Sequence, residues 1–247
     1  LYRDELETQG TNFFILDTKG KGSVYGDVDF VAYCWDIDHY NQVNDGDLFI
    51  YRRQQKASEI KGQFYFFGAG KISKIQSIEG KRVKGIISKA FIFDEPLLQE
   101  ELEDFKWEFR NRGKNWEHFF NQYGMNKITK NDFIHLLSFK PGVLQESKEI
   151  SSGMDEEVKF YQRQEGGNYR VEDQEGSSKT RGAAQKVFAN QVKLEYGFQC
   201  AVTGIKTKEL LVASHIVPWS EDKDNRLNPR NGICLSPLID KAFDKGF

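Results

Sequence analysis

The sequence predicts an α+β protein of two domains, and two patterns support this prediction. In the first half of the chain, short segments rich in Phe, Tyr, Ile and Val alternate with Gly, Asn and Asp turns, a pattern typical of a small β-barrel or curled sheet. Near the C-terminus a strand, a polar loop, a second strand and a helix follow one another. A chain of 247 residues is long enough for two separate cores.

Five strands are expected in the N-terminal domain, each separated from the next by turn-forming residues. They cover residues 11–18, 28–35, 47–53, 63–75 and 84–93. Residues 96–113 then change to helical periodicity, with apolar positions from Leu98 to Phe109 on one stripe. We expect a helix there and a second one over residues 131–139.

One segment of the chain is strongly basic, although the overall net charge is −2. Between Arg52 and Lys89 there are ten Lys or Arg against two Glu, a net charge of +8. Such a block is typical of a phosphate-binding face, although a solvated lysine-rich surface would have the same composition. With a later basic helix, it supplies the candidate DNA-binding residues Arg52, Arg53, Lys71, Lys74, Lys81, Arg82, Arg181 and Lys186.

Residues 141–178 lose their hydrophobic periodicity and turn acidic, with nine acids against four bases from 143 to 176. We expect a linker here, joining a domain over 1–140 to a domain over 179–247.

A helix is expected at the start of the second domain, over residues 180–196, with Gly197 as its C-terminal cap. Between Lys179 and Lys193 it has four basic residues and no acid. This face could lie along a phosphate backbone, although an ordinary exposed helix would have a similar composition.

The three cysteines, Cys34, Cys200 and Cys234, form no C-x-x-C pair, and a chain of this size does not need disulfides. We therefore expect a reducing compartment. Without an apolar run of membrane-spanning length or a signal-peptide pattern, the expected location is the cytoplasm, with no membrane partner.

Residues that could take part in catalysis or metal binding lie at the ends of the strand and the helix expected in the C-terminal segment. His215 is near the end of an apolar strand, and Ser236 is placed to cap a helix that has Pro237 at its first position. Helical spacing puts Asp240 and Asp244 one turn apart on the same face. The histidine on the strand can therefore lie opposite an aspartate on the helix.

Four blocks carry a resemblance to a known family. They are C-x-x-T-G at 200–204, A-x-H-I-x-P-W at 213–219, R-L-x-P-x-N-G at 226–232 and D-x-x-F-D-x-G at 240–246. In this order they resemble one branch of the HNH endonucleases, the ββα-metal nucleases, over about residues 181–247. The resemblance implies hydrolysis of phosphodiester bonds in double-stranded DNA with a divalent cation.

Phosphodiester hydrolysis needs an activated water and a cation that offsets charge on the transition state. His215 is the candidate general base, because imidazole titrates near neutral pH. Asp240 is the candidate ligand for Mg²⁺, or for another divalent cation such as Mn²⁺, with Asp244 as a further ligand. Asn231 corresponds to the middle residue of the HNH name and would hold the loop and orient the site.

This chain departs from many HNH nucleases at two positions. Ser214 stands where they have an acidic residue, and Asp240 stands where they have a histidine. The metal would then be bound weakly, or with help from Asp244 or the scissile phosphate. The family continues into another strand beyond the position of Phe247, so we expect the nuclease domain to be truncated here.

The N-terminal domain resembles the PUA superfamily, which includes EVE, ASCH, YTH and SRA modules, over about residues 11–139. The resemblance rests on "VNDGDLFIYRR" followed by "FYFFGAGKISKI". It implies a β-barrel with flanking helices that holds a modified or flipped base in an aromatic cage. Tyr33 and Trp35 would stack on the base and Asp36 or Asp38 would accept from the cytosine amine, unless the two aromatic residues are barrel core.

The sequence thus predicts a modification-dependent restriction endonuclease that binds 5-methyl- or 5-hydroxymethylcytosine in DNA and cuts with its HNH domain. A homodimer would allow both strands to be cut. The alternatives are an HNH nuclease that reads phosphorothioate, a glucosylated base or unmodified sequence, and a non-catalytic nucleic-acid-binding regulator with a decayed HNH domain.

Overall fold

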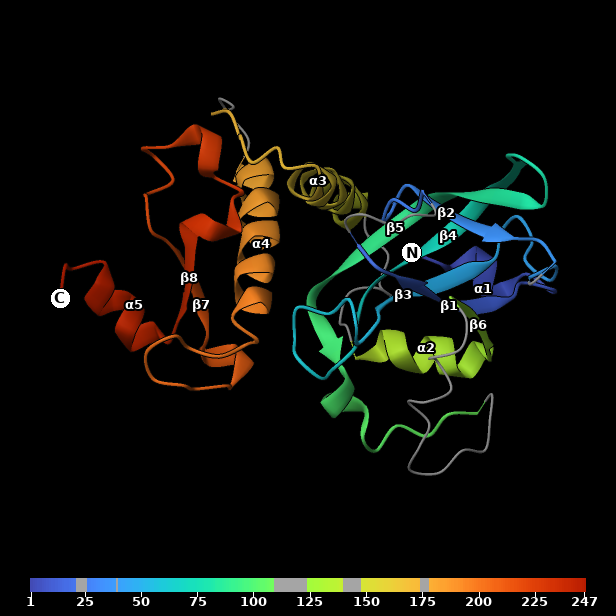
Figure 1. Cartoon of the computed structure of the whole chain (residues 1–247), viewed down its shortest axis with the longest axis horizontal. Coiled ribbons are helices and arrows are strands. Elements are labelled where there is room, and N and C mark those ends of the chain that lie inside the picture. The colour runs from blue at the N-terminus through green and yellow to red at the C-terminus, as the bar shows by residue number, and fades with distance from the viewer. Residues whose placement is uncertain (21–25, 39, 109–123, 140–147, 174–177) are drawn as a thin grey trace. The chain divides into compact units, whose positions relative to one another are not determined.

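The computed structural model describes residues 1–20, 26–38, 40–108, 124–139, 148–173 and 178–247. The chain forms two compact units. The first contains Leu1–Ser58 and Gly62–Ser151, and the second contains Glu59–Lys61 and Ser152–Phe247. Figure 1 labels the elements of both units, which are described separately below.

The first unit is built on a six-stranded sheet with the strand order β2-β5-β4-β3-β1-β6. Strands β1 and β3 are parallel, and the other neighbouring pairs are antiparallel. The five predicted strands are all present, whereas β6 was not predicted. Their bounds are β1 Phe13–Thr18, β2 Ala32–Asp36, β3 Leu48–Arg53, β4 Tyr65–Ser77, β5 Arg82–Leu98 and β6 Met125–Ile128.

The sheet is curled, so that side chains from its edge strands β2 and β6 lie near each other. Tyr33 on β2 hydrogen-bonds through its hydroxyl to the carbonyl oxygens of Asp17, on β1, and Gly124, next to β6. The Tyr40 hydroxyl accepts a hydrogen bond from the Met125 amide at 3.4 Å. Side chains from one edge therefore reach the other edge, and the unit is a mixed α and β fold around a curled sheet.

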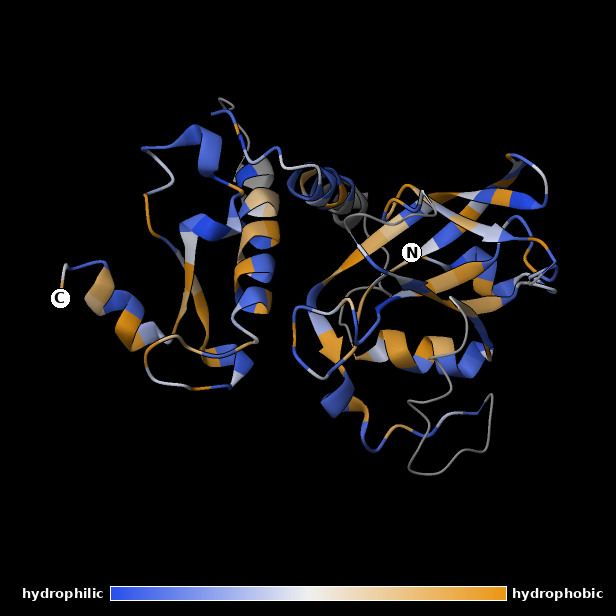
Figure 2. Cartoon of the chain, in the orientation of Figure 1, coloured by the Kyte–Doolittle hydropathy of each residue, from blue (hydrophilic) through white to orange (hydrophobic). Residues whose placement is uncertain are grey.

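Two helices cover parts of this sheet, α1 (Arg3–Glu7) and α2 (Lys130–Ser138). Figure 2 shows apolar residues along α2 and along the long strands. The buried Phe133 of α2 packs with its ring centroid 5.2 Å from that of Phe13 on β1. The helix expected over 131–139 is thus confirmed, and its apolar face closes one side of the core.

The helix expected over residues 96–113 is wrong for its described part. Strand β5 continues to Leu98, followed by a short 3-10 helix at Gln99–Leu102 and by irregular chain up to residue 108. Leu98 pairs with Tyr65 on β4, so its backbone is part of the sheet ladder. Phe109 and residues 110–113 lie outside the described residues.

The second unit places a β-hairpin between two helices. Helix α4 (Ser178–Glu195) and helix α5 (Pro237–Phe243) both pack on β7 (Val212–His215) and β8 (Gly232–Leu235), as Figure 1 shows. Gly197, with φ of 61°, follows α4 and takes the left-handed conformation expected of a C-terminal cap. The predicted strands and helices of this segment are confirmed.

Helix α3 (Lys148–Glu165) lies within residues 141–178, where a linker was expected. Its buried residues include Val158, Phe160 and Gln164, so this part of the segment contributes to a packed core. None of the helices that the structure describes has the length and apolar character needed to cross a membrane.

Candidate active site

The β7–β8 hairpin is the frame of the site, and it places His215 opposite Gly232. Helix α4 approaches the hairpin closely at this point. A Cβ atom on Gly232 would lie 2.3 Å from Cγ2 of Val192 and 2.8 Å from Cζ of Phe188. Only glycine therefore allows α4 to pack against the end of β7, where His215 is located.

His215 is held by one hydrogen bond and two aromatic contacts. Its Nε2 lies 3.0 Å from the carbonyl oxygen of Arg226. Its ring stacks on Phe188 with centroids 3.7 Å apart and an interplanar angle of 9°, and it meets Trp219 edge to face at 5.7 Å. These contacts restrict both the position and the rotation of the imidazole.

The Arg226 contact also fixes the tautomer of His215. A carbonyl oxygen can only accept, so Nε2 must carry the hydrogen. In the neutral ring, Nδ1 then has the free lone pair and is the basic atom. Burial lowers the pKa of His215 and outweighs the opposing effect of the hydrogen bond to the Arg226 carbonyl. The imidazole is therefore neutral at neutral pH and able to accept a proton.

Asn231 holds the chain just after His215. Its side-chain oxygen accepts from the Val217 amide at 2.8 Å, and its side-chain nitrogen donates to the Val217 carbonyl at 3.1 Å. The Asn231 carbonyl accepts from the Ile216 amide at 2.9 Å. Asn231 is only 9% exposed, and its three bonds to the more exposed Ile216 and Val217 fix the exit of β7.

Asp240, on α5, contacts the residue next to His215 and not His215 itself. Its carboxylate accepts a hydrogen bond from the hydroxyl of Ser214, the residue that precedes His215 on β7. Ser214 is buried and Asp240 is half-buried. The two residues that depart from the common HNH pattern therefore contact each other directly.

The start of α5, which carries Asp240, is held by a buried cysteine. The sulfur of Cys200 accepts hydrogen bonds from the backbone amides of Ser236 at 3.1 Å and Thr203 at 3.4 Å. The C-x-x-T-G block thus anchors the residue that precedes Pro237, and this anchor sets where α5 begins.

The carboxylates of α5 are suited to a hard divalent cation. A carboxylate has about four lone-pair positions, so the bond from Ser214 leaves acceptor capacity on Asp240. Asp244, the C-cap residue of α5, is exposed one turn further along. Within the described residues, no group of three or more His, Cys, Asp or Glu side chains could hold a metal ion. This small donor set fits Mg²⁺, which keeps several waters and binds through one or two carboxylates plus phosphate.

The structure places the aromatic residues of the expected base pocket in the core. Tyr33 is 5% exposed and Trp35 is 7% exposed. The Tyr33 hydroxyl bonds to two carbonyls as described above, and the indole nitrogen of Trp35 donates to the Tyr40 carbonyl at 3.1 Å. Asp36 is half-buried and accepts from the Asp38 amide at 2.9 Å. These residues close the sheet and do not form an open cage.

Arg52 and Arg53 were predicted to bind DNA, but both are buried and their guanidinium groups bind carboxylates of this unit. Arg52 donates twice to the carboxylate of Asp17, at 2.5 and 2.6 Å. Arg53 donates to Asp29 at 2.9 Å and to the Thr18 hydroxyl at 2.7 Å. The formal charge of the basic block therefore overstates what solvent or a phosphate can reach.

The remaining basic residues of the block differ in their surroundings. Lys71 is half-buried and pairs with the buried Glu5 at 2.8 Å, whereas Lys81 is exposed and pairs with Asp38. Lys74 and Arg82 are exposed on β4 and β5. The exposed DNA-binding candidates of this block, Lys74, Lys81 and Arg82, thus lie near the turn that joins these two strands.

On α4, Arg181 and Lys186 are both exposed. The guanidinium of Arg181 lies 5.6 Å from the centroid of the Trp219 ring, and Lys186 pairs with Glu157 at 3.0 Å. Arg181 is therefore the basic candidate that shares an aromatic neighbour with His215.

Two residues of the site were not selected from the sequence. Phe188, which stacks on His215, is one of many apolar residues on α4. Arg226, whose carbonyl accepts from His215, opens the R-L-x-P-x-N-G block, and this position was its only signal.

Comparison with known proteins agrees with this geometry. A family model described as HNH endonuclease matches residues 200–247, which include β7, β8 and α5. No curated protein matches the chain. Residues 200–247 of the second unit are therefore similar to HNH endonuclease domains, and this similarity indicates a nuclease.

Proposed function

We propose that this protein is a metal-dependent DNA endonuclease in which His215 is the general base. The observation that carries the proposal is the hydrogen bond from Nε2 of His215 to the Arg226 carbonyl. It directs the basic Nδ1 away from that contact, while the Asp240 carboxylate lies against the adjacent Ser214. A general base and an anionic metal ligand are what hydrolysis of a phosphodiester requires, and Asp240 contacts the residue that precedes the base on β7.

In the proposed mechanism, Nδ1 of His215 takes a proton from the water that attacks the phosphorus, while the bond from phosphorus to the leaving sugar oxygen breaks and that oxygen takes a proton from solvent. The Arg226 carbonyl then faces an imidazolium, and its hydrogen bond to Nε2–H strengthens as the positive charge develops. Phe188 and Trp219 keep the ring in place while the proton moves. Asn231 keeps the end of β7 in position, so that the base does not turn away.

Asp240 would hold the divalent cation, with Asp244 as a further carboxylate on the same helix. When bound, the cation would offset the negative charge that develops on the phosphate in the transition state. Ser214, through its hydrogen bond, would orient the Asp240 carboxylate.

The first unit would supply recognition of DNA that contains modified cytosine. The support for this part is the resemblance to modified-base readers, the curled sheet, and the exposed residues Lys74, Lys81 and Arg82 near the β4–β5 turn. Since Tyr33 and Trp35 are core residues, a base would have to be read by other side chains of this unit.

Cleavage of supercoiled plasmid tests the nuclease proposal. We expect nicking in Mg²⁺ or Mn²⁺ and none in excess EDTA. Asp240→Ala should abolish cleavage without loss of folding, because a catalytic Mg²⁺ site is not a structural one. Asp155→Ala, which removes an exposed acid from α3 of the same unit, is the matched control and should cut normally. Undiminished activity in EDTA would reject metal dependence.

Recognition is tested with matched duplexes that carry cytosine, 5-methylcytosine, 5-hydroxymethylcytosine or phosphorothioate. We expect tighter binding to one of the modified cytosines, and only a modest gain, because a buried methyl contributes about 0.8 kcal/mol. Equal affinity for all four duplexes would reject modification-dependent binding and leave the nuclease proposal standing.

A further inference from the structure

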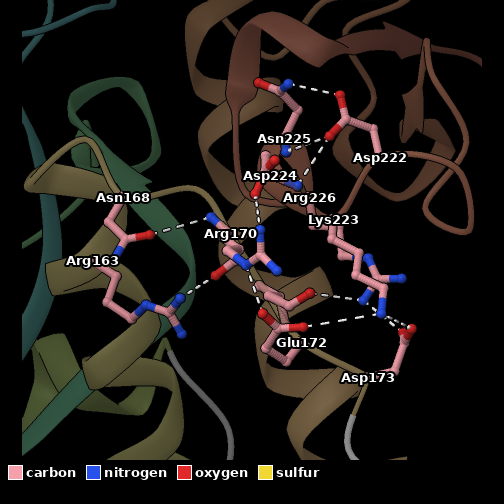
Figure 3. Close-up of polar contacts among 11 residues, drawn as sticks. Arg163, Asn168, Arg170, Glu172, Asp173, Asp222, Lys223, Asp224, Asn225 and Arg226 are labelled. Carbon is pink, nitrogen blue, oxygen red and sulfur yellow. Dashed lines mark hydrogen bonds and ion pairs between the residues drawn. The ribbon is translucent and has the colours of Figure 1, made fainter.

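The chain between α3 and α4 lies against the loop that joins β7 to β8, as Figure 3 shows. The Val171 amide donates to the Lys223 carbonyl at 3.0 Å, and the Leu227 amide donates to the Tyr169 carbonyl at 2.9 Å. These two backbone bonds lie on either side of Arg226 in the loop. Residues 169–171 thus hold the loop at both ends of the stretch that contains Arg226.

The side chain of Arg226 is enclosed by the same segment. It is 2% exposed, and its Nε donates to the Trp219 carbonyl at 2.8 Å. One terminal nitrogen donates to the Val171 carbonyl at 2.8 Å and pairs with the Asp173 carboxylate at 2.7 Å. A buried guanidinium needs such partners, because burying an unpaired charge is very costly.

Asp173 has a distinct place among the polar contacts of Figure 3. Arg170 pairs with Glu172 and Asp224, each at 2.6 Å, and all three side chains are more than half exposed. Exposed pairs of this kind contribute little. Asp173 is itself 60% exposed, but one of its partners, Arg226, is buried; it also pairs with Lys223 at 2.7 Å.

The contacts form a continuous path from this segment to the base. Asp173 and the Val171 carbonyl hold the side chain of Arg226, and the backbone bonds hold the loop around it. The carbonyl of the same Arg226 accepts from Nε2 of His215. A shift of Arg226 would therefore move the acceptor that orients the imidazole.

We propose that Asp173, together with the backbone of residues 169–171, positions His215 through Arg226. This segment lies outside residues 200–247, which match the HNH family model, so the site would depend on chain that precedes the matched domain. Asp173 is a positioning residue and takes no part in proton transfer. The inference rests on the proposed role of His215 as the base.

Asp173→Ala in the full chain tests this inference, with Glu172→Gln as the matched control. Glu172 is the neighbouring acid, and it pairs with Arg170 and Lys223 rather than with Arg226. In Asp173→Ala we expect the single-turnover cleavage rate to fall roughly tenfold or more, because small misplacements of catalytic groups are costly. The dissociation constant for DNA should not change. Asp173→Glu should restore part of the rate, and Glu172→Gln should retain all of it.

A second readout does not depend on cleavage. In NMR spectra of the full chain, the Nε2–H of His215 should exchange slowly in the wild type and in Glu172→Gln, and faster in Asp173→Ala. Normal cleavage and unchanged exchange in Asp173→Ala would overturn the inference. If the wild type cuts no DNA, the proposed function fails, and the exchange rates still decide whether Asp173 positions His215. If Asp173→Ala does not fold, Arg226→Lys, which keeps the charge but loses the planar fork, should show the same faster exchange.

Discussion

Three effects act on the imidazole of His215. Burial, the largest, and the positive charge of Arg226 disfavour the charged ring, whereas the hydrogen bond from Nε2 to the Arg226 carbonyl favours it. The pKa of His215 therefore lies below its ordinary value of about 6.5. The same hydrogen bond selects Nδ1 as the basic atom. Burial thus keeps the His215 imidazole neutral, and Nδ1 can still accept a proton.

The pH dependence of cleavage follows from this direction. A base is active when it is neutral, and a lowered pKa keeps His215 neutral to a lower pH. We therefore expect kcat/KM to be constant near pH 7 and to decrease only below about 6.5. A pH profile measured at saturating metal checks this. An acid limb centred above 6.5 would contradict the burial argument.

The sequence predicted some site residues and missed others, for a physical reason. His215, Asn231 and Asp240 were predicted because their residue types and their places at strand and helix ends are local signals. Phe188 was missed because its stacking depends on how α4 packs. Asp173 was missed because its partner Arg226 is distant in sequence. Arg52 and Arg53 were misassigned because charge alone does not reveal burial.

Among the glycines for which the structure describes the surroundings, Gly232 on β8 would bring an added Cβ atom closest to another atom, at 2.3 Å. Gly232→Ala would place a Cβ atom against Val192 and Phe188 of α4. We expect a loss of about 1–3 kcal/mol in the free energy of unfolding, typical of overpacking. Chemical denaturation of the full chain measures this change.

Gly182 is the matched control, since it is on α4 and a Cβ atom there would meet nothing within 4 Å. Gly182→Ala should leave stability unchanged or raise it by about 1 kcal/mol through helix propensity. Equal effects of the two substitutions would contradict the close approach of α4 to β8.

The β1–β3 pair contains a buried ion pair whose disruption should be costly. Arg52→Met would leave the carboxylate of Asp17 buried, with only the Gln54 side chain at 3.1 Å still bonded to it. We expect a loss of about 3–5 kcal/mol, because an uncompensated buried charge is strongly destabilising. Thermal unfolding measures it, and a stability equal to that of the wild type would show that Arg52 is exposed.

The boundaries of elements followed the local sequence where local signals fixed them: the Thr129 side chain caps α2, Pro237 begins α5 although the Ser236 side chain makes no capping bond, and turn residues bound β7 and β8. The apolar stripe of residues 96–113 was misread because Leu97 and Leu98 pair with Phe66 and Tyr65 on β4. Strand pairing in the tertiary structure outweighed local helical periodicity. The short strand β6 has no clear alternating pattern, and it forms by pairing with β1.

For the chain as a DNA-binding protein, the exposed basic residues near the β4–β5 turn should set the salt dependence. If Lys74 contacts a phosphate, Lys74→Glu should reduce the slope of log K against log salt by about 0.9 or more. Lys127→Glu, at an exposed position on β6 outside the basic block, should leave it unchanged. Binding titrations at several salt concentrations measure both slopes, and equal slopes would place the DNA-binding face elsewhere.

The central claim, that His215 is the base of a DNA endonuclease, is tested most directly by single-turnover cleavage with His215→Ala. The cleavage rate of His215→Ala should be lower than that of the wild type by about a hundredfold or more at saturating metal, and its affinity for DNA should be unchanged. His135→Ala, at an exposed histidine on α2, should cut at the wild-type rate. Cleavage by His215→Ala at the wild-type rate would contradict the claim.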